Sequence, residues 1–400
     1  MALGGFDEVG VAARNRRARV AVAALFLTNG ALFANLLPRY PEIKADLALS
    51  NSAYGVAIAA FSGGALVAGL AAAPLIRRFS SAGVAVASSV GIAVLVFFAS
   101  LAPSAVVLAA ALFIAGACDA VTDVAQNAQA LRVQRNYGRS IINSSHAVWS
   151  VGAVLGGGMG AAAIALHIPR TTHLAISAAL FSVVVITAYP FLLRGPDDDD
   201  HPSTRPERGS RPRLGLYVTL AALVLIAIAG AVVEDAGSSW ATLYLHDSLG
   251  APAALAAFGY IAMVGFQFIG RLMGDRLVDR FGERAVARAG GLITAAGMGT
   301  ALAFPSVVGT IAGFAAAGFG VATLVPAAMH GADQLPGLRP GTGLTAVAWL
   351  MRVGFVSSPP VVGLIADATS LRVGLLVVPV AGVAVMLLAV ALSPRRLPAR

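Results

Sequence analysis

The chain has 400 residues, 58% of them hydrophobic and only 12% charged, with a formal net charge of +9. Because a soluble domain carries about 25% charged residues, this composition excludes a soluble globular protein. The one cysteine, Cys118, excludes a disulfide framework and a cysteine-based metal site. The sequence has no glycine-rich phosphate loop, zinc-protease helix or nucleophile elbow, so we expect neither an enzyme nor a cofactor.

Apolar stretches long enough to cross a bilayer follow one another along the whole chain. A helix crosses about 30 Å of hydrocarbon with about 20 apolar residues. Strands of a membrane β-barrel would be about 10 residues long and would alternate in polarity, a pattern that the sequence lacks. We therefore predict an all-α membrane protein with twelve transmembrane helices. The predicted spans are 18–37, 53–76, 82–102, 104–131, 140–166, 171–193, 214–240, 252–276, 285–303, 307–330, 342–366 and 371–393.

The basic residues predict how the chain is oriented in the membrane. With twelve spans, both termini face one side, where 22 of the 28 lysines and arginines fall, against four on the other side. Cytoplasmic loops are the loops enriched in Lys and Arg. We therefore place both termini in the cytoplasm and the protein in the cell's inner membrane. The net charge reflects this topology, and we expect no nucleic-acid partner because no basic stretch is interleaved with aromatic residues.

Residues 194–213 divide the spans into two sets of six. This stretch is polar, rich in proline and charged in both signs, which is typical of a linker without a packed core. We expect it to be cytoplasmic. The predicted domains are a six-helix bundle over residues 1–193, this linker, and a second six-helix bundle over residues 214–400.

The two halves also resemble each other in sequence at an offset of 202 residues. Residues 69–84 and 271–286 both follow the second span of their half, and the fifth spans share Gly152 and Gly354. The matching pairs in the first comparison are Leu70/Leu272, Leu75/Leu277, Arg78/Arg280, Phe79/Phe281 and Val84/Val286. A duplicated six-span unit is typical of transporters whose substrate site lies near the midplane between the halves.

The segment GDRLVDRFGER over residues 274–284 resembles the loop motif of the major facilitator superfamily. Asp279, Arg280, Gly282 and Arg284 match that motif. The first-half copy is degraded, because it reads RRFSS, without the motif's Asp and Gly. The resemblance implies the twelve-helix facilitator fold, and a gating role for Asp279, Arg280 and Gly282.

A narrower resemblance links the chain to the bacterial branch of fucose-permease-like and rhizopine-permease-related proteins. It rests on Asp123 and Asn127 in the fourth span and on residues 137–157, YGRSIINSSHAVWSVGAVLGG. The resemblance implies proton coupling through Asp123. The fucose-permease group also has an Asp before a Leu-Leu-Pro in the first span, whereas this chain has Asn35 there. Sugar specificity is therefore not implied.

Polar residues inside the first-half spans are the first group of candidate site residues. The spacing of Asp119, Asp123, Gln126 and Asn127 puts them on one face of a helix, and such a face should line a cavity because lipid disfavours it. His146 lies at nearly the depth of Asp123, so we predict proton coupling by Asp123, His146 and Asp119. A structural hydrogen bond between helices is the alternative. The expected substrate-binding residues in this half are Gln126, Asn127, Asn29 and Asn143.

The second half adds three further groups of charged candidates, two of them for substrate binding and one for gating. Glu234 and Asp235 lie late in the seventh span and point about 100° apart, so we expect one of them to face the cavity. Arg352 lies near the middle of the eleventh span and needs an anion, either an acidic residue or the substrate. Arg271 and Asp275 are spaced as a pair near the cytoplasmic end of the eighth span, which favours a structural or gating role.

These observations together favour a secondary transporter that moves a small organic solute by alternating access. Proton-coupled symport of a polar, sugar-like compound is the leading interpretation, with protons, the substrate and the lipid bilayer as partners, and a monomer as the expected state. One alternative is proton-coupled efflux of amphipathic drugs or metabolites. Exporters often end a glycine motif of the fifth span in Gly-Pro, but GAVLGGGMG over residues 152–160 has no proline. A second alternative is a membrane sensor that binds a ligand without transporting it.

Overall fold

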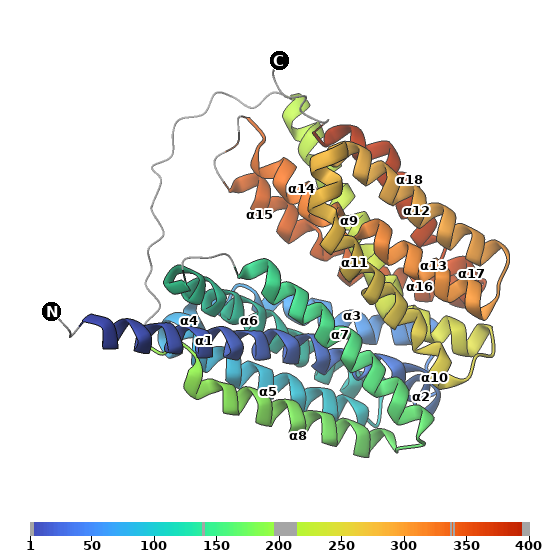
Figure 1. The fold of residues 1–400 in the computed structure, drawn as a ribbon. Helices are drawn as coiled ribbons and strands as arrows, with labels where there is room; N and C mark the ends of the chain where they lie inside the picture. The colour runs from blue at the N-terminus through green and yellow to red at the C-terminus, as the bar shows by residue number, and fades with distance from the viewer. Residues whose placement is uncertain (1–3, 138–140, 196–213, 337, 339–340, 394–400) are drawn as a thin grey trace. The chain divides into compact units, whose positions relative to one another are not determined.

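The computed structural model describes residues 4–137, 141–195, 214–336, 338 and 341–393, without the side chains of residues 4–13, 143 and 214. Helices are the regular structure of these described ranges (Figure 1). The first-half helices are α1 (Gly4–Ala34), η1 (Leu37–Arg39), α2 (Tyr40–Asp46), α3 (Asn51–Ala68), α4 (Ala72–Phe79), α5 (Ser81–Ser100), α6 (Ala105–Tyr137), α7 (Ile142–Ala165), α8 (Arg170–Ala188) and η2 (Tyr189–Phe191). The second-half helices are α9 (Leu214–Leu243), η3 (Tyr244–Ser248), α10 (Ala253–Ala256), α11 (Phe258–Phe281), α12 (Glu283–Ala303), α13 (Val307–Val321), α14 (Leu324–Asp333), α15 (Thr342–Leu350), α16 (Arg352–Ala368), α17 (Leu371–Gly374), α18 (Val377–Leu388) and η4 (Ala389–Ala391).

Among the described residues, eleven helical segments are long and apolar enough to cross a membrane. They coincide with eleven of the predicted spans. The remaining predicted span, 285–303, is the 21-residue helix α12, which begins with the charged residues Glu283, Arg284 and Arg288. The all-α membrane fold predicted from the sequence is thus confirmed.

Contacts within the described residues divide the chain into two compact units. The first consists of Met1–Arg39 and Ala60–Asp200, and the second of Tyr40–Ala59 and His201–Arg400. The segment Tyr40–Ala59 is grouped with the second half because its contacts lie there. The predicted boundaries at 193 and 214 enclose the linker, most of which lies outside the described residues, so these domain limits stay a prediction.

Three polar contacts hold that segment within the second unit. The Asp367 carboxylate accepts hydrogen bonds from the backbone N–H groups of Asn51 and Ser52, at 2.9 and 2.8 Å. These are unpaired donors of the first turn of α3, so the carboxylate caps the helix. The Tyr54 hydroxyl donates to the Ser239 carbonyl oxygen at 2.7 Å. α3 therefore begins on a cap supplied from more than 300 residues away.

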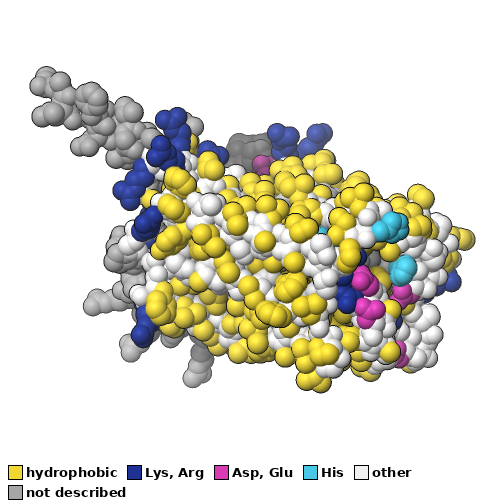
Figure 2. Space-filling view, turned by 90° about the horizontal axis from the view of Figure 1, so that it is seen from below, with side chains coloured by type: hydrophobic (Ala, Val, Ile, Leu, Met, Phe, Trp, Pro, Cys, Tyr) yellow, Lys and Arg dark blue, Asp and Glu magenta, His cyan; other side chains and the backbone are white. Residues whose placement is uncertain are grey.

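The core of the first unit is packed from alanine, valine and leucine side chains of α1, α5 and α6. Hydrophobic side chains also cover its outer surface. Ile176, Leu180, Val183 and Ile186 of α8 are each about half exposed and recur every three or four residues, so they form one face of the helix. Figure 2 shows that side chains of this kind occupy the middle of that surface, whereas Lys and Arg gather at one end. This distribution is typical of a surface that contacts lipid.

The sequence repeat is also a repeat of helix packing. A Cβ atom added to Gly116 of α6 would overlap the carbonyl oxygen of Phe61, and one added to Gly318 of α13 would overlap that of Met263. Each member of the second pair lies 202 residues after its counterpart. Small residues let membrane helices approach this closely. The crossing of α6 with α3 in the first half is therefore repeated by the crossing of α13 with α11 in the second half.

The serine caps at the starts of α6 and α13 repeat as well. Ser104 accepts from the Val107 N–H at 3.3 Å, and Ser306, 202 residues later, accepts from the Gly309 N–H at 3.1 Å. The repeat is broken where α13 ends and α14 begins. Pro326 has no N–H to donate to a preceding carbonyl, which interrupts an α-helix, whereas α6 is continuous over the equivalent positions.

Candidate functional site

The polar face of α6 meets α1 and α7 at the side chain of Asn29. This residue is 6% exposed, and its Nδ2 donates to Asp119 Oδ1 at 2.7 Å. Its Oδ1 accepts from the Trp149 indole N–H at 2.8 Å. A buried amide is stable only when its donors and acceptors are paired. Asn29 therefore links the three helices through a charged and a neutral partner.

The next turns of α6 carry Asp123, Gln126 and Asn127. Asp123 Oδ1 accepts from Asn127 Nδ2 at 3.0 Å and from Gln126 Nε2 at 3.4 Å. Gln126 is buried and also approaches Asn29 Oδ1 at 3.5 Å. Asp123 is exposed. The helical spacing seen in the sequence thus produces a connected set of carboxylates and amides, in which one carboxylate remains accessible.

The other first-half candidates lie on α7. The His146 ring packs edge-on against Phe26, with ring centroids 5.2 Å apart, and His146 is exposed. The predicted proton-accepting pair of His146 and Asp123 stays a prediction. Asn143 is the second residue of the same helix, and its side chain lies outside the described residues.

In the second unit, Glu234 of α9 faces two polar residues of α11. Its Oε2 accepts from Gln267 Nε2 at 2.9 Å and lies 3.9 Å from Arg271 Nη2. The side chains of Glu234 and Arg271 are 25% and 38% exposed. The sequence suggested a pair between Arg271 and Asp275. Within the described residues, the ion pair of Arg271 is instead with Glu234, because α9 brings a carboxylate to the more buried side of α11.

Asp235, the neighbour of Glu234, points into the packed interior of the second unit and is 7% exposed. Its Oδ1 accepts from the Ser239 hydroxyl at 3.1 Å, and its Oδ2 has no hydrogen-bond partner within the described residues. The two adjacent acids thus lie in different surroundings, and which of them faces a cavity stays a prediction. Glu234 is the more accessible acid, with two polar partners, and Asp235 is enclosed.

The remaining candidates lie at helix ends. Arg352 is the first residue of α16, half-buried, directly after the break at Met351. In the loop motif, Gly282 separates α11 from α12 with φ +83°, a conformation that favours glycine. Asp275, Asp279 and Arg280 are exposed on the last turns of α11.

Two residues of this arrangement were missed by the sequence reasoning, Trp149 and Gln267. Trp149 lies three residues after His146, and Gln267 lies four residues before Arg271. Each therefore shares a helix face with a residue that was recognised as a candidate. That spacing is the signal that would have identified them.

Comparisons with known proteins agree with this architecture. A sequence model of the Major Facilitator Superfamily matches residues 22–277. The transporter y4wD of Sinorhizobium fredii is 32% identical to this chain over 361 residues, which cover 88% of this chain and 92% of that protein. The structure of the nucleoside transporter NupG has a TM-score of 0.73 and 13% identity, covering 94% of this chain and 98% of that one.

FucP, a facilitator-superfamily transporter solved in the outward conformation, is a further structural neighbour. It has a TM-score of 0.59 and 19% identity, over 93% of this chain and 97% of that one. At these identities the solved structures show a shared fold alone.

Proposed function

The chain belongs to the major facilitator superfamily of membrane transporters, and from this premise we propose that it carries a small, polar, sugar-like solute across the inner membrane together with protons. Transport is by alternating access. The observation that supports this proposal most strongly is the connected set of Asn29, Asp119, Asp123 and Gln126 with Trp149. Amides and an indole N–H offer both donors and acceptors, which suits a solute rich in hydroxyl groups.

Asp123 is the proposed proton carrier. A carboxylate inside a membrane span is costly unless it is paired or hydrated, and Asp123 accepts hydrogen bonds from the neutral amides of Gln126 and Asn127. It is also exposed, so protons can reach it. Asp119 is held by Asn29, and we assign it a supporting role, with His146 as a further proton acceptor.

Asp235 is a second candidate for carrying a proton. A buried carboxylate with one hydroxyl partner is costly as an anion, and Asp235 is in this situation. Glu234, by contrast, has an amide and a guanidinium beside it and is the better candidate for binding solute. Arg352 is proposed to provide positive charge to the substrate or to an acid, and Asn143 to add a polar contact.

The proposed test separates proton coupling from solute movement. Asp123→Asn keeps the shape of the side chain but cannot titrate, so we expect it to abolish accumulation of solute against a gradient while exchange across the membrane continues. Asp333→Asn is the matched control, because it neutralises an exposed acid at the end of α14 that has no part in the proposed site. Accumulation that survives in Asp123→Asn, as it does in the control, would refute this assignment.

The proposed orientation places both termini and residues 194–213 in the cytoplasm. It rests on the excess of Lys and Arg on that side of the predicted topology. Reporter fusions at residue 205 and at the C-terminus test it. A periplasmic signal from either fusion would overturn the topology, and with it the assignment of Asp279, Arg280 and Gly282 to a cytoplasmic gate.

A further inference from the structure

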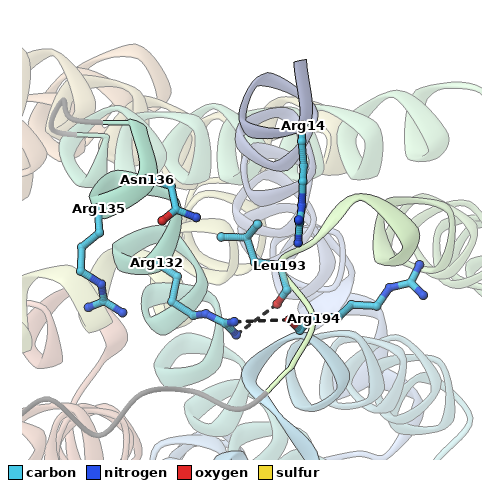
Figure 3. A pocket seen from close by; sticks show the side chains of 6 residues that line it. All are labelled: Arg14, Arg132, Arg135, Asn136, Leu193 and Arg194. Atoms are coloured by element: carbon cyan, nitrogen blue, oxygen red, sulfur yellow. Dashed lines mark hydrogen bonds between the residues drawn. The ribbon is translucent and has the colours of Figure 1, made fainter. Parts of the chain in front are cut away.

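A pocket lined by arginine side chains lies in the first unit, at the end where α1 begins and α6 ends. Its volume is about 180 Å³. The lining residues, drawn in Figure 3, are Arg14, Arg132, Arg135, Asn136, Leu193 and Arg194. We call this the arginine pocket. Four arginines thus contribute to the lining of one cavity, with Arg14 and Arg132 both directed toward Leu193 (Figure 3), and none of the lining side chains is acidic.

The walls of the arginine pocket are fixed to one another by hydrogen bonds. Gln129 of α6 donates to the Leu193 carbonyl oxygen at 2.9 Å and accepts from the Leu193 N–H at 3.2 Å. Arg132 donates to the same carbonyl oxygen at 3.1 Å. On the other side, Asn15 of α1 donates to the Asn136 carbonyl oxygen at 3.1 Å. The pocket is therefore built by three tied segments, and Arg132 serves to position its wall.

Within the described residues, no acidic side chain pairs with the other arginines of the pocket. Arg14 and Arg135 have no hydrogen bond or ion pair there, and the Arg194 guanidinium lies over the face of the Tyr189 ring, at 5.2 Å. Like charges held together repel each other. An anion that enters the pocket relieves this repulsion and receives several N–H donors at once. Guanidinium groups match phosphate oxygens especially well, through paired N–H bonds.

The depth of the pocket favours a phosphate at the membrane surface. Arg132 lies 27 residues after Ala105, the first residue of α6, which is about 40 Å along the helix at about 1.5 Å per residue. A bilayer is about 40–45 Å thick when its headgroups are included, against about 30 Å for the hydrocarbon alone. Arg132 therefore lies at the level of the lipid phosphates, where basic pockets between spans bind anionic headgroups.

We propose that the arginine pocket binds a phosphate group, carried by an anionic lipid or by a free phosphate compound. Its charge, walls and depth make this a site separate from the polar face of α6. The linker supplies one competing anion in the sequence, because Asp197–Asp200 follow shortly after Arg194. The experiment must therefore distinguish an added phosphate from these aspartates.

The test is the thermal midpoint of the purified full chain in neutral detergent, since a ligand that binds the folded state raises it. The additions are phosphatidylglycerol, phosphatidylcholine and inorganic phosphate, each used alone. We expect phosphatidylglycerol to raise the midpoint by several degrees, and phosphatidylcholine to leave it unchanged. The variant Arg14→Gln/Arg135→Gln should lose at least half of that rise, whereas Arg77→Gln/Arg78→Gln, which removes the same charge from exposed residues of α4, should keep it.

Three other outcomes of this experiment would also support or overturn the proposal. A rise with inorganic phosphate alone, lost in Arg14→Gln/Arg135→Gln, would support the site and assign it to a soluble phosphate compound. An equal rise in wild type and in both double variants would overturn it, because the lipid would then act elsewhere. No rise in wild type, but a rise once Asp197–Asp200 are replaced by Asn, would also overturn it, since the linker acids would be the natural occupant.

Discussion

α6 and its repeat partner, α13 followed by α14, share a scaffold but differ in chemistry. Both begin after a capping serine, Ser104 or Ser306, and both pack through a glycine on the carbonyl of a neighbouring helix. Their facing side chains differ. The positions equivalent to Asp119, Asp123, Gln126 and Asn127, 202 residues later, are Val321, Val325, Ala328 and Met329.

The acids of α9 show the reverse asymmetry. Glu234 and Asp235 correspond to Leu32 and Phe33 of α1. Duplication therefore accounts for how the helices pack, and later substitution accounts for where polar groups lie. Since polar groups inside a membrane protein are costly, their presence in one copy only is the best indication that they serve function. The predictions that follow first test the helix packing that the two halves share, and then the polar groups that occur in one half only.

The largest effect is expected at the shared glycines. Gly116→Ala and Gly318→Ala each place a methyl group against a backbone carbonyl of the neighbouring helix, which forces the helices apart. We expect each change to reduce stability on the order of 3 kcal/mol, measured as loss of folded protein in detergent. Gly158→Ala, where an added Cβ meets nothing within 4 Å, is the control. A mild effect at one glycine and a severe effect at the other would break the equivalence of the two halves.

We expect the Asn29 side chain to stabilise the first unit. The equivalent residue in the second half is Ala231, so the repeat itself does not require an amide at this position. Asn29→Ala removes the hydrogen bonds that Asn29 makes to Asp119 and to the Trp149 indole, at a cost of about 2 kcal/mol. Thermal unfolding measures this loss. Asn127→Ala removes a half-exposed amide that donates to Asp123 of its own helix, and we expect a smaller change. Equal effects would mean that Asn29 does not organise the cluster.

Ser80 and Gly282 are equivalent positions of the repeat. They share a backbone conformation with positive φ but differ in residue type. Ser80 has φ +65° and Gly282 has φ +83°, and a non-glycine residue is strained there. Ser80→Gly should therefore raise stability by about 1 kcal/mol, and Gly282→Ser should lower it. Calorimetry measures both. A loss of stability in Ser80→Gly would show that the Ser80 hydroxyl, 3.5 Å from the Gly83 N–H, stabilises the start of α5 more than the strain costs.

The smallest expected effect concerns Arg271. A double-mutant cycle between Arg271→Gln and Glu234→Gln should give a coupling energy below about 1 kcal/mol, because the pair is 3.9 Å apart and partly exposed. The cycle between Arg271→Gln and Asp275→Asn should give none. Coupling in the second cycle alone would restore the pair that the sequence spacing suggested.

The sequence predicted the helices, their order and the repeat well, because length and hydropathy determine what can cross a bilayer. It also placed Asp119, Asp123, Gln126 and Asn127 on one face, since helical spacing is local information. It could not predict contacts between distant helices. The Arg271–Glu234 pair, the role of Asn29 as a link and the capping of α3 by Asp367 all depend on how helices pack.

We propose above that the protein uses a proton gradient to accumulate its solute. The measurement that tests it most directly is uptake into proteoliposomes, using a ligand found by a thermal-shift screen of sugars, cyclitols, amino acids, nucleosides and antibiotics. We expect an inward proton gradient to drive accumulation above the external concentration, and a protonophore to abolish it. Binding without flux, or flux that reaches only equal concentrations whatever the gradient, would contradict the proposed proton coupling.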